Sequence, residues 1–281
     1  SPQPEARPPS PRAPSSPTAP PAIITPHADD VSAMRAWLRR QLAGETPLQV
    51  QGEPVFEHAQ DLPVAQALQQ ANASAKLRFV PQDDLPDGSA YETHVFQTGR
   101  VPTRDNPHDL FNGLVWLGYP QAKARVNELQ AAQIVRDGVQ PVRGPVRDAL
   151  TLLDENGALL LAPPPLYQAL CARQWRTLFV DQRALWAQAQ LLIFGHALLE
   201  KLLNPRKDLT AHVYLPRQPM PDAGAGAHAL DSWLARDLTP EHLATKPFTP
   251  LPVLGVPGWW PESENFSFYD DSQVFRPRRT P

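Results

Sequence analysis

A chain of 281 residues with 42% hydrophobic residues is long enough to bury a substantial core, and its formal net charge of −3 lacks the positive excess of most nucleic-acid binders. One cysteine, Cys171, excludes an intramolecular disulfide and a cysteine-rich zinc site. No run of about 18 apolar residues offers a membrane span, and no secretory leader is recognised. Nucleic acid and membrane are therefore not expected as partners, and a cytoplasmic location is predicted.

Proline is concentrated at the start of the chain. Of the 35 prolines many lie in residues 1–26, among Ser, Ala and charged residues. Such a segment cannot bury enough apolar surface to offset the entropy of an ordered chain. We therefore predict a disordered proline-rich leader over residues 1–26 and a single globular domain over residues 27–281.

Helical and strand patterns alternate in the next part of the chain. Capping residues up to Ser32 precede apolar positions at helical spacing, which predicts a helix that ends near Gly44. A second helix is expected over Pro63–Asn72. Aromatic and β-branched residues then predict strands at Leu77–Val80 and Tyr91–Phe96.

Two consecutive helices are the clearest elements of the pattern. Asn106 is a good cap and Pro107 suits the first helical position, so an apolar helix is expected over residues 107–119. An amphipathic helix follows over Gln121–Arg136, and the two should pack as a helical hairpin. Lys123 and Arg125 are interpreted as part of its solvated face.

The second half of the chain is predicted from three segments. Asn156 and Gly157 separate two apolar runs, which favours a β hairpin over the alternative of a helix ending at Gly157. Residues 184–203 are apolar on nearly every side, as expected of a buried central helix. From Pro247 onward Gly, Pro and aromatic residues predict a long irregular C-terminal strap. The predicted fold class is α+β, mainly helical, with a few short strands.

Four motifs in one order resemble a known family. They are RDNPHDLFNGLVWLGYPQAKARVNELQ, RGPVRDALTLLDENG, FGHALLEKLL and PVLGVPGWWPESENFSFYDDSQVFRP. On these motifs the sequence resembles the bacterial domain of unknown function 3025 family over roughly residues 31 to 278. The resemblance implies that this region is one unit, and it implies no reaction.

The first candidate site lies on the apolar helix after Asn106. His108 and Asn112 stand four residues apart on one face, with Arg104 and Asp109 nearby. A functional interpretation makes His108 a general base or metal ligand, Asp109 a second ligand or orienting carboxylate, and Arg104 and Asn112 substrate-binding groups. In the alternative, Asp109 stabilises the helix start and His108 lies at the surface.

The second candidate pair repeats this spacing. His196 and Glu200 are four residues apart in the predicted central helix. His196 is a catalytic or metal-ligating candidate, and its alternative is a core histidine bonded to Glu200 or to a backbone carbonyl. A divalent metal ion is the cofactor that the metal candidates suit; these candidates are His108, Asp109, His196 and Glu200.

Two arginines form an anion-binding candidate. Arg143 and Arg147 flank a Gly-Pro turn, and paired guanidinium groups suit phosphate or carboxylate. The alternative is an internal ion-pair network with Asp148, Asp154 or Glu155.

The strap carries a dense group of aromatic residues. If exposed, these side chains would serve as a binding platform for a partner, whereas buried they would anchor the strap on the core. The residues are Trp259, Trp260, Phe266, Phe268 and Tyr269.

Two functions follow from these candidates. The first is a hydrolase-like enzyme that acts on a phosphorylated or carboxylated small molecule, a small anion, through a cleft lined by His, Asp and Arg side chains. The alternative is a non-catalytic binding or assembly protein that contacts a protein partner through its strap and leader. Clustering in one pocket would support the enzyme, whereas dispersal would remove it; the residues concerned are His108, Asp109, Arg143, Arg147 and His196. The oligomeric state does not follow from the sequence.

Overall fold

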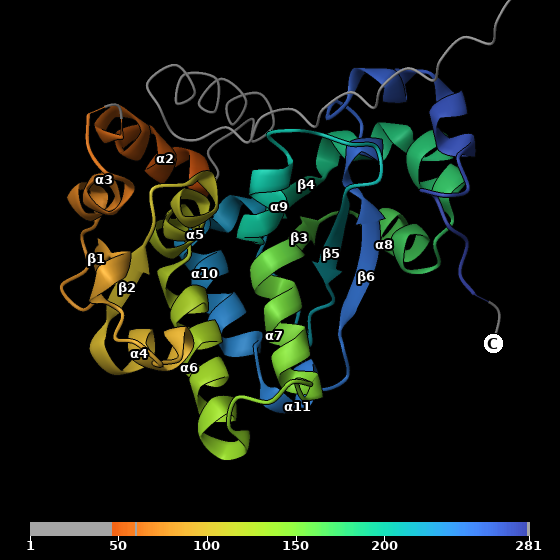
Figure 1. Cartoon of the computed structure of the whole chain (residues 1–281). Helices are drawn as coiled ribbons and strands as arrows, with labels where there is room; N and C mark the ends of the chain where they lie inside the picture. Colours follow the sequence, from red (N-terminus) through yellow and green to blue (C-terminus); the bar gives the residue numbers. More distant parts are fainter. Residues whose placement is uncertain (1–46, 60, 280–281) are drawn as a thin grey trace, which may run out of the picture.

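The computed structural model describes residues 47–59 and 61–279, and Figure 1 shows the arrangement of their helices and strands. The predicted leader over residues 1–26 and the predicted helix ending near Gly44 lie outside the described residues. The predicted class, α+β and mainly helical, is confirmed. Buried apolar side chains from α2 (Pro47–His58) to the C-terminal strap form one continuous hydrophobic cluster. No described helix is long and apolar enough to cross a membrane.

The N-terminal part combines two helices with a small parallel sheet. The predicted helix and first strand are present as α3 (Val64–Ala71) and β1 (Arg78–Pro81). β1 pairs in parallel with β2 (Arg100–Thr103), with Phe79 opposite Val101.

The strand predicted at Tyr91–Phe96 is wrong, because these residues form helix α4 (Tyr91–Thr98). Gly99 ends the helix in the left-handed region at φ 67°, and its N–H donates to the carbonyl of Val95. A Cβ at this position would lie 2.2 Å from the carbonyl oxygen of Lys76. A glycine cap of this kind stabilises a helix end, and here it prevails over the β propensity of the preceding residues.

The predicted helical hairpin is confirmed as α5 (Pro107–Gly118) and α6 (Pro120–Asp137), which are in contact. The Asn106 side chain caps α5 by accepting a hydrogen bond of 2.8 Å from the Asp109 N–H. Lys123 was predicted on a solvated face, and this is wrong. The side chain of Lys123 is buried between α6 and α7 (Pro145–Asn156), where it pairs with Asp154.

The hairpin predicted around Asn156 is also wrong. Helix α7 runs directly into strand β3 (Gly157–Leu161), so the weighed alternative of a helix ending here is correct. The apolar residues before the turn recur at helical spacing: Ala149, Leu150 and Leu153 are all buried on one face of α7. That period, rather than the Asn-Gly pair, decides the local structure.

β3 is one of the two inner strands of a four-stranded sheet in the order β4-β3-β5-β6 (Figure 1). It pairs antiparallel with β4 (Gln190–Ile193) and parallel with β5 (Thr210–Tyr214). β6 (Phe248–Pro252) completes the sheet by pairing antiparallel with β5.

The predicted central helix over residues 184–203 is wrong in its extent. The segment divides into a 3-10 helix (Arg183–Gln188), strand β4 and the short helix α9 (His196–Lys201). A run that is apolar on every side suits a strand buried on both faces as well as a buried helix, so periodicity could not distinguish them. Only α9 keeps the buried helical character that was expected.

Further helices and short turns complete the described chain. They are α8 (Pro164–Cys171), a π turn (Thr177–Asp181), α10 (Ala227–Asp237), α11 (Pro240–Leu243) and 3-10 turns at Gln82–Asp84, Ala223–Ala225, Val253–Gly255, Pro261–Glu264 and Phe266–Asp270. The strap therefore begins as strand β6 and is otherwise built of short turns, as its composition predicts. Phe268 and Tyr269 are buried in it, and the Tyr269 ring stacks on Phe179 with centroids 4.9 Å apart. These two aromatic residues anchor the strap.

Candidate functional site

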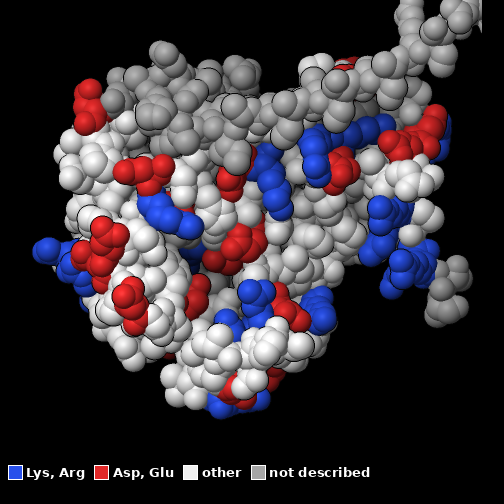
Figure 2. All heavy atoms as spheres, in the orientation of Figure 1, with Lys and Arg blue, Asp and Glu red and all other residues white. Residues whose placement is uncertain are grey.

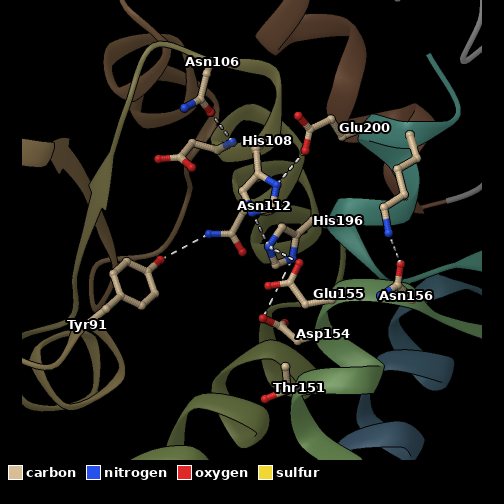
Figure 3. Close-up of polar contacts among 12 residues, drawn as sticks. Tyr91, Asn106, His108, Asn112, Thr151, Asp154, Glu155, Asn156, His196 and Glu200 are labelled. Atoms are coloured by element: carbon tan, nitrogen blue, oxygen red, sulfur yellow. Dashed lines mark hydrogen bonds and ion pairs between the residues drawn. The ribbon is translucent and has the colours of Figure 1, made fainter. Parts of the chain in front are cut away.

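Three helices bring the polar side chains of the site together (Figure 3). His108 lies in the first turn of α5, and His196 is the first residue of α9. Asp154 and Glu155 lie in the last turn of α7. Because α9 packs against both α5 and α7, residues distant in sequence meet at one place.

Two histidines and one carboxylate converge at the centre. The Nε2 atoms of His108 and His196 lie 3.1 Å apart, and Glu155 Oε2 lies 3.6 Å from His196 Nε2. The potential ligand atoms of these three residues all lie within 4.8 Å of one another. The two rings meet edge to face, with an interplanar angle of 76°, so both Nε2 atoms point to the same region.

Glu200 orients the first histidine. Its Oε2 lies 2.7 Å from His108 Nδ1, which therefore carries the proton and donates to the carboxylate. This contact leaves the Nε2 of a neutral His108 with a lone pair directed at His196. A carboxylate behind a ligating histidine is the usual support of a metal site.

His196 is buried and uncharged. Burial and the nearby Lys123 lower the pKa of His196 to about 3, so the ring stays neutral at physiological pH. Its buried Nδ1 has no hydrogen-bond partner among the described residues, and Asp154 Oδ2 lies 3.8 Å away. If Nδ1 carries the ring proton, it faces this carboxylate and leaves the Nε2 lone pair toward His108; in the other tautomer, Nε2 donates to His108 Nε2 across 3.1 Å.

The acidic residues around the histidines have different protonation behaviour. Burial raises the pKa of Asp154, but its ion pair with Lys123 outweighs this, so the pKa lies below its ordinary value. Burial and the charge of Asp154 raise the pKa of Glu155. For Glu92 of α4, the same two causes raise the pKa to about 7.

The two histidines and the acidic residues around them line a cavity of about 340 Å³; they are His108, His196, Glu92, Asp154 and Glu155. Figure 2 shows a hollow in the middle of this face of the molecule in which acidic side chains gather. Asn127 holds Glu92 at the wall by donating 2.8 Å hydrogen bonds to its carboxylate and its carbonyl. Asn112 donates to the Tyr91 hydroxyl at 3.2 Å, and burial raises the pKa of Tyr91. Other lining residues include Arg104, Asp109, Trp116 and Lys123.

Asp109 and Arg104 line the cavity but engage each other. Arg104 donates from Nε and Nη2 to the Asp109 carboxylate at 3.1 and 3.0 Å, and its backbone N–H donates at 2.7 Å. Asp109 thus closes the turn before α5, which agrees with its predicted alternative role at the helix start. Among the described residues, ligand atoms converge from His108, His196 and Glu155. The predicted metal candidates Asp109 and Glu200 are not in this group.

Arg143 and Arg147 lie outside this cavity. They line an adjoining cavity of about 610 Å³, which also touches Tyr91, Glu92, Asp154 and Glu155. The structure thus places the predicted residues in two neighbouring cavities, and His108, His196, Arg104, Asp109 and Asn112 share the first.

Sequence reasoning missed Glu155, Glu92 and the Lys123–Asp154 pair as parts of the site. One signal was present. Carboxylates are disfavoured in the last turn of a helix, where the dipole is negative, so Asp154 and Glu155 at the end of a helical run indicate a compensating charge. The choice of a β hairpin at this point concealed that signal.

The comparisons with known proteins concern nearly the whole of the described chain. The sequence model of the family described as "Protein of unknown function (DUF3025)" matches residues 77–279, which include every residue of the site. No curated protein and no solved structure matches the sequence.

Proposed function

Because this chain belongs to the DUF3025 family of proteins of unknown function, we propose its function from the geometry of the site. We propose a hydrolase that depends on a divalent metal ion held by His108, His196 and Glu155. Its substrate is a phosphorylated or carboxylated small molecule.

The observation that carries the proposal is the approach of the two Nε2 atoms to 3.1 Å beside a carboxylate. Glu200 accepts a hydrogen bond from Nδ1 of His108, and Asp154 faces Nδ1 of His196. With both Nδ1 atoms protonated, the two Nε2 lone pairs would repel each other at 3.1 Å unless a cation lay between them; without a cation, one ring must instead carry its proton on Nε2 and donate it to the other ring. A cation turns this arrangement from unfavourable to favourable.

The distances suit a first-row transition ion such as Zn²⁺. Two nitrogens about 2.0–2.1 Å from a tetrahedral ion lie roughly 3.3 Å apart. The observed 3.1 Å between the histidines and 3.6 Å from His196 to Glu155 are close to that spacing. Two imidazoles and one carboxylate also match the ligand set of hydrolytic zinc sites, which leave one position open.

The surrounding residues supply what such chemistry needs. A divalent ion held here would act as a Lewis acid and lower the pKa of a bound water. Glu92 lies in the same cavity, and with a pKa of about 7 it exchanges a proton in the neutral range, as a general acid or base must. Lys123 keeps Asp154 charged, which in turn favours the Nδ1 proton of His196.

The alternative of a binding protein that uses its strap receives less support. Phe268 and Tyr269 are buried against the core and are not available as a platform. Of the aromatic strap residues, Phe266 is the one with a largely exposed side chain, at 45%.

Elemental analysis of the purified, untagged protein tests the proposal. The protein is stripped with a chelator, incubated with Zn²⁺ or Mn²⁺, and desalted before measurement. We expect one equivalent of metal in the wild type and loss of it in His108→Ala and His196→Ala. Glu200→Gln should weaken binding about 10- to 100-fold, because it alters only the group that orients His108.

The matched control is His228→Ala, since His228 is an exposed histidine on α10 outside the cluster. It should retain full metal content. A wild-type protein that binds no metal, or variants of His108 and His196 that keep it, would overturn the proposal and favour a binding protein.

A further inference from the structure

The cavity next to the proposed metal site is acidic where it adjoins that site and is lined elsewhere by two arginines. Its volume is about 610 Å³, and four of its residues also line the first cavity: Tyr91, Glu92, Asp154 and Glu155. The two cavities thus share one wall, which is acidic. Of these two cavities, Arg143 and Arg147 line the second but not the first, and Arg143 also lines a third cavity together with Asp148 and Glu155.

The two arginines are not in direct contact with acidic side chains in the described part of the chain, although the charge of Arg147 opposes the rise in the pKa of Glu92. Neither forms an ion pair there, so the predicted alternative of an internal network with Asp148, Asp154 or Glu155 is not realised. Arg147 Nε donates to Gln130 Oε1 at 3.3 Å, which holds the side chain and leaves its Nη groups available. Two such guanidinium groups on one cavity suit an oxyanion.

Helix α7 separates Arg147 from the carboxylates beside the histidines. Arg147, Thr151 and Asp154 are spaced by four and three residues, so they lie on one face of α7, and all three line the second cavity. In Figure 3, Thr151 lies one turn from Asp154 along this face. Seven residues at 1.5 Å each separate Arg147 from Asp154 by about 10 Å along the axis.

Charge decides which end of this cavity an anion occupies. The shared wall holds Glu92, Asp154 and Glu155, which repel an anion, whereas the opposite end of the α7 face holds Arg147. Ile134 and Val139 also line the cavity and offer contact to an apolar spacer.

We infer that the second cavity is a subsite for the anionic group of the substrate. This inference rests on the proposed function, because it names the substrate class of the same site. The substrate is an elongated small molecule that carries a carboxylate or phosphate at the end remote from the bond that is cleaved. Arg147 and Arg143 bind the anion, and the metal site acts on the other end.

Anion binding by the stripped protein tests the subsite without the metal. Inorganic phosphate and acetate are titrated separately, by calorimetry and by chemical shift changes, into the wild type in the presence of chelator. We expect binding of at least one anion, and at least tenfold weaker binding in Arg147→Ala. Arg147→Lys should lie between the two because it keeps the charge and loses the planar fork.

Arg136→Ala is the matched control, since Arg136 is an exposed arginine near the end of α6. It should bind anions as the wild type does, and equal thermal midpoints would show that all variants are folded. Phosphate binding without acetate binding would assign the phosphorylated class, and the reverse the carboxylated class.

The subsite inference is overturned if the wild type binds neither anion, or if Arg147→Ala and Arg143→Ala bind as the wild type does. A stripped protein that binds an anion through Arg147 but never takes up a metal would overturn the metal-dependent hydrolase and leave the subsite. The two failures are thus distinguishable.

Discussion

Lys123 and Asp154 show how single buried charges define the site. Burying an ion without a partner costs several kcal/mol, so a lysine and an aspartate in the interior each require the other. Their pair fixes a negative charge 3.8 Å from Nδ1 of His196, and this charge favours the tautomer with its proton on Nδ1. Lys123 thus acts on His196 through Asp154 as well as through its own charge.

Glu92 should make the stability of the protein depend on pH. Its pKa is raised from 4.5 to about 7 in the folded state, so the folded chain holds a proton that the unfolded chain releases. The stabilisation is fully present below pH 4.5 and is lost as the pH rises through about 7. Replacing Glu92→Gln should remove this loss and raise the free energy of unfolding at pH 8 on the order of 2–3 kcal/mol relative to the wild type.

Urea unfolding of the chelated protein at pH 5 and pH 8 measures this effect. Glu128→Gln is the control, because Glu128 is an exposed carboxylate on α6, and it should leave the difference between the two pH values unchanged. If Glu92→Gln and the wild type lost the same stability between these pH values, the shifted pKa would be wrong.

Among the elements, the junction of α7, β3 and α9 positions the metal ligands. The N–H groups of Phe194 and Gly195 both donate to the carbonyl of Gly157, at 3.0 and 2.9 Å. This places the start of α9 against the end of α7, so His196 meets Asp154 and Glu155. The approach is possible because residue 195 has no side chain: a Cβ there would lie 2.4 Å from the backbone nitrogen of Asn156.

Gly195→Ala should therefore disturb both stability and metal binding. The added methyl meets backbone atoms that cannot rotate away, so α9 must shift, at a cost of about 1–3 kcal/mol. We expect a lower midpoint in urea and weaker metal retention. Gly144→Ala is a matched control because its Cβ would meet no atom within 4 Å and its φ of −71° is ordinary. Similar behaviour of the two variants would show that the close contact at Gly195 has no consequence.

At the scale of the whole molecule, the strap closes the hydrophobic cluster. Phe275 packs edge to face on Phe179 with centroids 5.8 Å apart, and Trp175 Nε1 donates to the carbonyl of Arg276 at 2.7 Å. The end of the described chain thus packs on the middle of the sequence. The buried apolar side chains of the strap belong to the same cluster as those of α5 and α7.

One cooperative unit should result, as the prediction of a single domain requires. Phe275→Ala should lower the free energy of unfolding by about 3–5 kcal/mol and shift the entire transition, because the strap and the core would unfold together. Coincident curves from tryptophan fluorescence and far-ultraviolet circular dichroism would check this. Phe266→Ala, at an exposed position, should cost less than about 1 kcal/mol. Two separate transitions, of which only one responds to Phe275→Ala, would contradict a single unit.

The sequence by itself determined the features that depend on neighbours along the chain. The cap at Asn106, the proline after it and the helical period predicted α5 and α6, and Phe268 and Tyr269 were recognised as potential anchors. His108 and His196 were selected because polar side chains on apolar helices require a partner or a function. Caps and helical periods depend on residues only a few positions apart, so they can be predicted from the sequence alone.

Tertiary structure alone decided which groups meet. His108 and His196 are 88 residues apart in the sequence, and Glu155 joins them only because α9 packs against both α5 and α7. A helical period reveals that a face is buried, but it does not reveal which face it meets, so Lys123 was assigned to solvent. For the same reason, the apolar run before Gly195 was compatible with a buried helix, and pairing with β3 made part of it strand β4.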